Sequence, residues 1–358
     1  MGALDGIRIL EFGGLGPVPF AAMLLADMGA DIIRVDRPGI IAGVPDPITG
    51  RGRPRVAADL NDPGEREDVL ALTEKADALL EGFRPGVMER LGLGPDVVLG
   101  QNPRLVYGRM TGWGQAGPLA HTAGHDLNYI APTGALAAIG PRDRPVPPLN
   151  LVGDYGGGAL YLVSGVLAAL LSAARTGRGQ IVDCAMCDGA LSLMSFFFEM
   201  AADHQWTPQR EANMLDGGAP YYGVYRCADG LDVAVGAIEP HFFADLLEKL
   251  DLDGAEFADR DDRACWPHLR QKIADRIATR SRLDWLKRVG ASDACLTPVL
   301  RFDEASEHPH LSARQALVTI DGLAQPAPAP RFSETPSSVS PERRKALDLK
   351  EAVARWEN

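Results

Sequence analysis

The chain has 358 residues, of which 46% are hydrophobic and 23% are charged, and its formal net charge is −12. A chain of this length can bury a large core in one or two domains, so it needs neither disulfides nor metal ions to hold its fold. The acidic balance argues against a nucleic-acid-binding protein, which would carry a basic excess.

Strands and helices alternate along the N-terminal part of the chain. The expected elements are strands over 7–12, 31–35, 55–60, 77–82, 104–112 and 177–186, and helices over 20–30, 85–92, 159–174 and 188–204. A further helix is expected to begin at Asp62, a capping residue, with Pro63 in its first turn. Such alternation is typical of a parallel sheet with helices on both faces, which places this part in the α/β class.

The pattern changes near residue 205. Residues 221–237 predict a hairpin around a glycine-containing turn, and helical segments follow over 240–250 and 266–288. Residues 324–332 are typical of an extended Pro-rich linker, and the amphipathic tail over 348–356 predicts a short helix that packs on the first domain. We therefore expect two domains: a large one over 1–204, completed by the C-terminal segment 316–358, and a small α+β one over 205–315.

The five cysteines are odd in number and irregular in spacing, which argues against a secreted disulfide framework. Cys184 and Cys187 form a single CxxC, and no second pair or nearby histidine completes a zinc site, so we expect ordinary buried thiols. No signal-peptide pattern opens the chain, and the apolar run over 159–174 is interrupted by Ser164 and Gly165 and is shorter than a membrane span. We expect a cytoplasmic protein that binds neither membranes nor nucleic acids.

Gly14 and Gly16 follow the first strand, and Asp36 lies about twenty residues further on, which imitates a dinucleotide-binding fingerprint. The third glycine of that fingerprint is missing, because Pro19 stands in its place. Pro17 and Pro19 also remove backbone N–H donors that would face a pyrophosphate. We therefore expect no nicotinamide cofactor, and a loop that admits another ligand or simply begins a helix.

Arginines are locally in excess in this otherwise acidic chain. They are Arg34, Arg37, Arg51, Arg53 and Arg55, followed by Arg84, Arg90, Arg104 and Arg109. Arginines at the ends of parallel strands gather at the edge of the sheet where ligands bind, and the guanidinium fork suits phosphate oxygens. A phosphate-bearing ligand is one interpretation of the cluster, and solvated surface arginines are the other.

Two further motifs suggest proton-transfer chemistry. The segment GHD contains His125, and GDYGGG places Asp154 before three glycines and the expected helix. A helix N-terminus offers unsatisfied N–H donors and partial positive charge, so an oxyanion would be stabilised there. Alone, His125 is an ordinary packed histidine and Asp154 a helix cap. Together they can remove a proton from one face of a carbon and return it to the other, with no metal, redox centre or nucleophile.

Six segments resemble the α-methylacyl-CoA racemases of the family III CoA-transferase superfamily. They are ADMGADIIRVDRP, EGFRPGVMERLGLGP, MTGWGQAGP, AGHDLNYIA, PPLNLVGDYGGGAL and NMLDGGAPYYGVYRCADG. The resemblance runs from residue 4 to about residue 335 and is weakest over 250–290 and at the tail. It implies a Rossmann-like large domain, a smaller domain, and an interlocked homodimer in which each active site lies between the large domain of one chain and the small domain of the other.

The resemblance also implies roles for individual residues. His125 and Asp154 would act as the two acid/base groups, on the S face and the R face of the α-carbon, and a backbone N–H near Asp154 would hold the enolate oxygen. Glu239 would hydrogen-bond the catalytic histidine of the partner chain, fixing its tautomer and favouring imidazolium. CoA is part of the substrate, so no cofactor is expected. The implied CoA-binding residues are Arg37, Ala58, Asp59, Leu60, Asn61, Gly82, Phe83, Arg84, Arg90, Gly124, Asp126, Leu127, Asn128 and Tyr129, with Arg37 and Arg90 as phosphate partners.

Two alternatives stay open. In a CoA-transferase of the same superfamily, the aspartate that matches Asp154 is a nucleophile that forms an acyl anhydride, but those enzymes generally lack a histidine at the position of His125. A non-catalytic acyl-CoA-binding protein would need neither residue. The acyl chain is not specified: branched fatty acyl, sterol side-chain and arylpropionyl esters are all candidates, with residues 193–200 and Leu15 as candidates for the acyl-binding surface.

Overall fold

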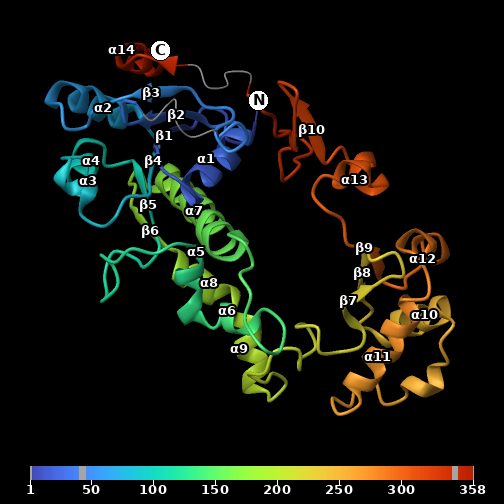
Figure 1. Cartoon of the computed structure of the whole chain (residues 1–358). Coiled ribbons are helices and arrows are strands. Elements are labelled where there is room, and N and C mark those ends of the chain that lie inside the picture. Colours follow the sequence, from blue (N-terminus) through green and yellow to red (C-terminus); the bar gives the residue numbers. More distant parts are fainter. Residues whose placement is uncertain (1, 40–45, 341–345, 358) are drawn as a thin grey trace. The chain divides into compact units, whose positions relative to one another are not determined.

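The structure of the protein, a computed structural model, describes residues 2–39, 46–340 and 346–357. The chain forms two compact units (Figure 1). Unit 1 contains residues 1–135, 148–195 and 325–358, and unit 2 contains residues 136–147 and 196–324. The division predicted from the sequence falls instead after residues 204 and 315 and leaves 136–147 in the large domain. That segment belongs to unit 2, where the Arg210 guanidinium donates hydrogen bonds to the carbonyl oxygens of Ala137, Pro141 and Arg142.

Unit 1 is built on a seven-stranded parallel sheet with the order β12-β3-β2-β1-β4-β5-β6. The strands are β1 (Arg8–Phe12), β2 (Asp31–Asp36), β3 (Arg55–Ala57), β4 (Ala78–Glu81), β5 (Val106–Thr111), β6 (Ile181–Ala185) and β12 (Ala346–Leu347). The order reverses at β1, where Ile9 is paired with Ile32 of β2 and with Ala78 of β4. Such sheets bind ligands outside the carboxyl ends of their strands at this reversal. The sheet confirms the predicted α/β, Rossmann-like class.

Helices cover both faces of the sheet (Figure 1). They are α1 (Pro17–Asp27) and α7 (Leu160–Thr176) on one face, and α2 (Pro63–Lys75), α3 (Val87–Arg90), α4 (Pro95–Gln101) and α14 (Leu349–Glu357) on the other. Successive side chains of a strand point to opposite faces of the sheet, so Ile9 packs with the helices of the first face and Leu10 with those of the second. Helix α14 confirms the predicted C-terminal helix: Trp356 is 1% exposed, and its indole Nε1 donates to Asp31 Oδ2 at 2.8 Å.

The apolar helix in the middle of the sequence is longer than predicted. η2 (Leu151–Ala159), a π-helical segment, continues directly into α7. The combined stretch Leu151–Thr176 is long and apolar enough to cross a membrane, judged by length and composition alone. It contacts β5, β6 and α1, and Leu162 and Val166 are fully buried there. This packing makes it a core helix of unit 1.

Unit 2 has its own hydrophobic core around a small antiparallel sheet with the order β7-β8-β9. Its strands are β7 (Tyr222–Arg226), β8 (Asp232–Gly236) and β9 (Leu296–Pro298), and its longer helices are α10 (Pro240–Leu250), α11 (Trp266–Ile277) and α12 (Arg282–Val289). Strands β7 and β8 form the predicted hairpin. The helical region predicted over 266–288 is two helices, because Ser281 caps a new one by accepting the Asp284 N–H.

Two other predicted elements differ from the structure. The helix predicted over 188–204 is divided into α8 (Met186–Leu193) and α9 (Ser195–Ala202). The predicted linker begins as a strand, since β11 (Leu323–Pro326) pairs with β10 (Leu317–Ile320). Gln325 is 1% exposed there and accepts a hydrogen bond from Arg51. The remaining short elements are α5 (Asp126–Ile130), η1 (Ala131–Thr133), α6 (Ala135–Ala138), η3 (Gly254–Phe257), η4 (Ala305–Glu307) and α13 (Pro309–Ala313).

Candidate active site

Two adjoining cavities of unit 1 lie at the carboxyl ends of β1 and β4. The large cavity has a volume of 750 Å³ and the small cavity a volume of 370 Å³. Leu15, Gly16 and Phe83 line both of them, so the loop after β1 and the loop after β4 form their common boundary. The cavities therefore occupy the reversal of the strand order, where open α/β sheets bind their ligands.

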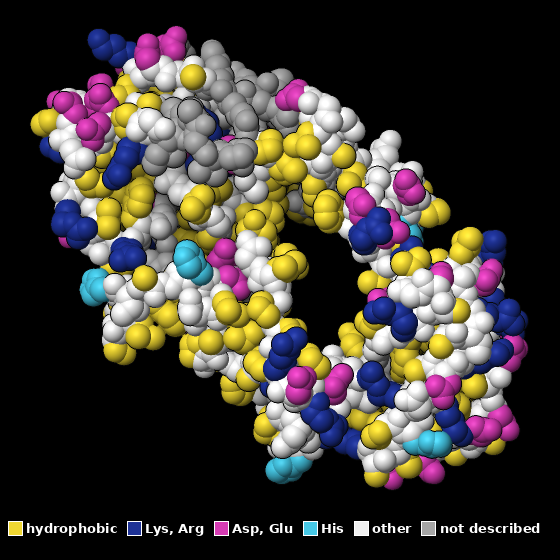
Figure 2. All heavy atoms as spheres, in the orientation of Figure 1, with side chains coloured by type: hydrophobic (Ala, Val, Ile, Leu, Met, Phe, Trp, Pro, Cys, Tyr) yellow, Lys and Arg dark blue, Asp and Glu magenta, His cyan; other side chains and the backbone are white. Residues whose placement is uncertain are grey.

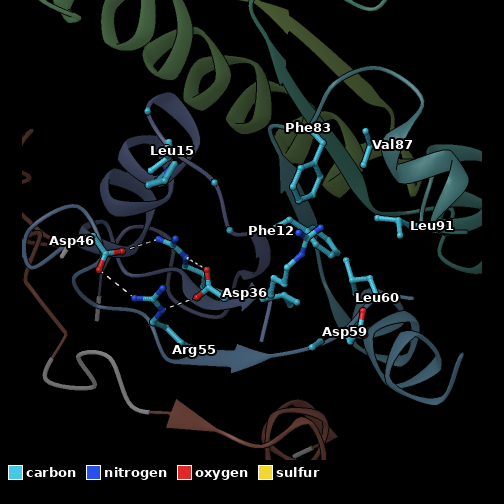
Figure 3. A pocket seen from close by; sticks show the side chains of 18 of the residues that line it. Phe12, Leu15, Asp36, Asp46, Arg55, Asp59, Leu60, Phe83, Val87 and Leu91 are labelled. Carbon is cyan, nitrogen blue, oxygen red and sulfur yellow. Dashed lines mark hydrogen bonds and ion pairs between the residues drawn. The ribbon is translucent and has the colours of Figure 1, made fainter. Parts of the chain in front are cut away.

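The large cavity gathers residues from several separate segments of the chain. Of the predicted binding residues, it is lined by Arg37, Ala58, Asp59, Leu60, Asn61, Phe83 and Arg90. Figure 3 shows Phe83, Val87 and Leu91 on one side of it and Asp36, Asp46 and Arg55 on the opposite side. Arg37 and Arg90 are exposed, and no carboxylate in the described ranges lies within ion-pair distance of either guanidinium. Both remain available to an anionic ligand.

Two other arginines of the cluster are already paired within the wall of the large cavity, and Figure 3 labels one of them, Arg55, beside Asp36 and Asp46. The Nε atoms of Arg34 and Arg55 lie 3.0 Å and 2.6 Å from the Asp36 carboxylate. Their Nη1 atoms lie 2.9 Å and 3.2 Å from the Asp46 carboxylate. All four side chains are nearly buried, the most exposed being Asp46 at 11%. The interpretations of Arg34 and Arg55 as free phosphate partners or as solvated surface residues are therefore both wrong.

The next two arginines are internal as well. Arg51 is 2% exposed and forms an ion pair with Asp27 at 2.5 Å. Arg53 and Glu11 are both fully buried, and the Arg53 Nε lies 2.8 Å from a Glu11 oxygen. Isolated buried charges are costly, so each guanidinium needs the carboxylate beside it. Of the five arginines clustered over 34–55, Arg37 is thus the one that lines the large cavity without an ion pair to a described residue.

The small cavity contains both predicted acid/base residues, His125 and Asp154. It is also lined by five of the predicted CoA-binding residues: Gly82, Phe83, Arg84, Gly124 and Tyr129. His125 and Asp154 are 29 positions apart in the sequence, and they meet because α5 packs against η2. The sheet itself contributes the loops after β4 and β5 to the opposite wall.

His125 is the N-cap residue of α5, and its backbone is firmly held. The Asn128 side-chain oxygen accepts the His125 N–H at 3.1 Å, and the Asn128 N–H donates to the His125 carbonyl at 2.7 Å. The Tyr129 ring lies against Gly112 and Gly124, where an added Cβ would come within 2.0 Å and 2.7 Å of ring atoms. The Tyr129 hydroxyl donates to the Gly124 carbonyl. His125 is exposed and lines the small cavity.

Asp154 is half-buried in η2, close to the loop after β1. An added Cβ on Gly16 would lie 3.1 Å from Asp154 Oδ2, so this glycine allows the loop to approach the carboxylate. The pKa of Asp154 is raised, and the largest cause is burial. The hydrogen bond from Asn150 and the nearby His125 lower this pKa, whereas the charge of Asp126 adds to the rise. A raised pKa brings a carboxyl group closer to the range in which it exchanges protons with substrate.

The predicted helix start after Asp154 is wrong. Asp154 lies within the helical stretch that begins at Leu151, so the three glycines are not at a helix N-terminus. Their small size serves packing against α8: an added Cβ would lie 2.6 Å from Ala190 N at Gly157 and 2.9 Å from Met186 Cγ at Gly158. The Asp154 N–H is also occupied, because it donates to Asp126 Oδ1 at 2.6 Å. Asp154 itself therefore does not provide the expected anion hole.

The remaining predicted residues do not line either cavity. Asp126 is buried, Asn128 holds the His125 backbone, and the exposed Leu127 lies on α5 away from the lining. Glu239 is an exposed residue at the N-cap of α10 in unit 2. Asp46 and Tyr155, which were not predicted, also line the large cavity. No motif marks Asp46; the stacking of Tyr155 on Phe20, with ring centroids 4.2 Å apart, appears only in the fold.

Residues 4–344 match the CoA-transferase family III. The chain belongs to this family. It is 43% identical over 343 residues to the α-methylacyl-CoA racemase of Mus musculus, covering 95% of this chain and 89% of the mouse protein. The human α-methylacyl-CoA racemase is 42% identical, with 94% and 88% of the two chains covered. These matches confirm the resemblance inferred from the six sequence segments.

Solved structures of the family share the fold of the chain. The crystal structure of Rv3272 from Mycobacterium tuberculosis superposes with a TM-score of 0.82 at 26% identity, covering 97% of each chain. A CAIB/BAIF family protein from Brucella suis gives a TM-score of 0.80 at 24% identity, with 99% of each chain covered. The likeness to the second structure shows the fold alone. Both agree with the large parallel sheet described above.

Proposed function

We propose that the protein is a racemase of 2-methyl-branched acyl-CoA thioesters. The observation that carries the proposal is that His125 and Asp154 line one small cavity. Histidine exchanges protons near neutral pH, and burial raises the pKa of Asp154, so both groups suit proton transfer. The racemases of mouse and human, which are 43% and 42% identical to this chain, support the choice of substrate.

The proposed reaction is a 1,1-proton transfer. One group removes the α-proton, and the electron pair of the C–H bond moves into the thioester carbonyl to give an enolate. The other group then delivers a proton to the opposite face, and the electron pair returns to form the new C–H bond. We assign the S face to His125 and the R face to Asp154. One proton leaves the substrate and one returns to it, with no net change in charge or oxidation state, so the proposed reaction uses no cofactor.

The large cavity is the proposed site of the CoA body. CoA carries a 3′-phosphate and a pyrophosphate, and Arg37 and Arg90 are the arginines in the lining of this cavity that form no ion pair with a described residue. Phosphate groups are held well by bidentate guanidinium contacts. Because the two cavities adjoin at Leu15, Gly16 and Phe83, a pantetheine arm laid along this boundary would bring the thioester into the small cavity.

We further propose that the protein acts in lipid metabolism, in the cytoplasm, as a homodimer. All five cysteines are free, which suits a reducing compartment. Hydrophobic side chains, yellow in Figure 2, gather at the surface over α7 and α8. Leu160 is 49% exposed, and Leu191 and Leu193 are each 45% exposed. Helices α7 and α8 touch through a Tyr161–Ser192 hydrogen bond of 2.7 Å, and we take the exposed leucines of these neighbouring helices as one apolar surface. A second copy of the chain is its proposed cover.

Sedimentation velocity tests this assembly. Leu191→Glu places a charge in the apolar surface and should shift the protein from dimer to monomer. Val97 on α4 is 42% exposed, so Val97→Glu is a control of similar exposure at a different place and should leave the dimer intact. A wild-type chain that sediments as a monomer, or a Leu191→Glu variant that stays dimeric, would contradict the proposed interface.

Glu239 is proposed to hydrogen-bond His125 of the partner chain. Two variants that we expect to be inactive as homodimers, His125→Ala and Glu239→Gln, test this when they are unfolded together and refolded. A heterodimer of the two variants contains one site with both native residues, so an equal mixture should regain about a quarter of wild-type activity in a twofold-symmetric dimer. If Glu239 acted within its own chain, no heterodimer site would be complete and no activity would return.

A CoA-transferase with Asp154 as nucleophile is the second candidate. Several transferases are related to this chain, among them the acetyl-CoA:oxalate CoA-transferase of Acetobacter aceti at 29% identity and the succinyl-CoA:mesaconate CoA-transferase of Haloarcula hispanica at 33%. His125 in the same cavity as Asp154 favours racemisation, because nucleophilic transfer has no use for a second proton-transfer group there.

Deuterium exchange decides between the candidates. With a 2-methylacyl-CoA ester in D₂O, the wild-type protein should exchange the α-hydrogen and lose the chirality of the substrate. His125→Ala should lower the rate about 10²–10⁴-fold, the range for a lost general acid/base. Transfer of CoA to an added free acid without exchange would establish the transferase, and binding of the ester with neither reaction would establish a non-catalytic binding protein.

A further inference from the structure

Asp126 follows His125 directly and is 8% exposed, although it lines neither cavity. Its Oδ1 atom accepts the backbone N–H of Asp154 at 2.6 Å, a contact between residues 28 positions apart. Gly153 makes this approach possible, because an added Cβ would lie 2.5 Å from Asp126 Oδ1. A buried carboxylate is costly unless it is well paired, yet the Oδ2 atom of Asp126 has no hydrogen-bond partner among the described residues. Stability alone gives little reason for a carboxylate here.

The Asp126 contact joins the two acid/base residues mechanically. His125 is bonded to Asp126 through the chain at the start of α5, and Asp154 is bonded to Asp126 through its own N–H. One short hydrogen bond therefore fixes the backbone of Asp154 in η2 relative to the backbone of His125. A misplacement of about 1 Å in such a site can cost roughly 10²-fold in rate.

The same carboxylate also acts on the charge of the site. Besides Asp126, the titratable groups that face Asp154 or share its cavity are His125 at the N-cap of α5, Tyr129 on α5 and Arg84 in the loop after β4, and the Asn150 amide at the N-cap of η2 donates to the Asp154 carboxylate. Asp126 contributes the second carboxyl group near Asp154. Its negative charge opposes ionisation of Asp154 and favours the protonated carboxyl group that must return a proton to the substrate.

We propose that Asp126 is a positioning residue for racemisation, which holds Asp154 at a fixed place opposite His125 and sets a second carboxyl group beside it. The inference rests on the proposed function. It predicts that Asp126 affects the rate of proton transfer in both directions and leaves the binding of the CoA body alone, because it lies outside the large cavity.

Two substitutions of Asp126 separate its hydrogen bond from its charge. Asp126→Ala removes both and should lower kcat in both directions about 10–10²-fold while KM stays within about twofold of the wild-type value. Asp126→Asn keeps an oxygen acceptor for the Asp154 N–H and should recover most of kcat. Because it removes the negative charge, the acid limb of the Asp126→Asn pH–rate profile should move to lower pH.

Gly153→Ala perturbs the same contact without changing any charge. The added methyl group should displace the Asp126 carboxylate and lower kcat as Asp126→Ala does. Gly100→Ala is the matched control, because Gly100 is also helical and an added Cβ meets no atom within 4 Å; it should leave kcat unchanged. Thermal unfolding of each variant shows whether it is folded at the assay temperature.

The wild-type exchange of α-hydrogen is measured first, so a failure of the proposed function is seen before any variant is compared. If the wild-type protein exchanges, kcat of Asp126→Ala within about twofold of wild type overturns the positioning role. A loss of rate accompanied by an equal rise in KM for both Asp126 variants, or an acid limb that does not move in Asp126→Asn, overturns it as well.

Discussion

Asp46 bridges Arg34 and Arg55 at the wall of the large cavity, and its substitution by Asn gives a quantitative test of the buried charge network. Its carboxylate lies 2.9 Å from Arg34 Nη1 and 3.2 Å from Arg55 Nη1, and the side chain is 11% exposed. A hydrogen bond to a charged group contributes about 1.5–3 kcal/mol, and breaking a buried ion pair costs about 3–5 kcal/mol. Asn retains one oxygen for one guanidinium, so we expect the free energy of unfolding to fall by about 3 kcal/mol.

For a unit of this size, a loss of about 3 kcal/mol corresponds to a fall in melting temperature of roughly 6–12 °C. Calorimetry of the full chain measures it. Asp303→Asn is the control, because the Arg301–Asp303 pair has the similar length of 3.0 Å but is 68% and 56% exposed; its melting temperature should not change. A fall of less than about 2 °C for Asp46→Asn would refute the view that these four charges are mutually dependent.

The same variant has a kinetic consequence under the proposed function. Asp46 lines the large cavity and not the small one, so Asp46→Asn should raise KM for the acyl-CoA ester and leave kcat within about twofold. A fall in kcat at unchanged KM would place the wall of the large cavity in the proton-transfer step and contradict the proposed separation of the two cavities.

Three other predictions follow from single contacts. Trp356→Ala should destabilise unit 1 by about 3–5 kcal/mol in chemical unfolding, because the ring is 1% exposed and holds α14 to the sheet; an unchanged transition midpoint would contradict that docking. Arg90→Gln should raise KM for the ester about tenfold or more and weaken its salt dependence, with kcat unchanged, and an unaltered KM would remove Arg90 from the phosphate site. Burial raises the pKa of Asp154, so the acid limb of kcat/KM for the R enantiomer should lie above the usual aspartate value of about 3.9. The same raised pKa means that this group stabilises the fold most at low pH, and its contribution declines as pH rises through the folded-state pKa.

The sequence alone was sufficient for the class of the fold and for much of the candidate site. Alternation of apolar strands with amphipathic helices is a local pattern, so it predicted the parallel sheet and the C-terminal helix with Trp356. His125 and Asp154 were found by motif, and the structure brings them to one cavity. Arg37 and Arg90 were selected by resemblance, and both line the other cavity.

The tertiary structure decided which charges are free and which are paired. The sequence offers no way to tell Arg34 and Arg55 from Arg37. The pairing of β2 with β3 places Arg34 beside Arg55, and Asp36 and Asp46 then lie within reach of both guanidinium groups. The sequence predicted a helix start at the glycines after Asp154, whereas the packing of α8 against them extends the helix back to Leu151.

Asp126 is the clearest case of a role that only the fold could assign. Its position beside His125 was visible in the sequence, but its partner, the backbone N–H of Asp154, is 28 positions away and is reached through the contact of α5 with η2. Hydrophobic periodicity and capping motifs depend on residues within one or two turns of each other, so the sequence alone is enough to predict them. Contacts between polar groups on different elements depend on which elements become neighbours, which is a property of the packed chain as a whole.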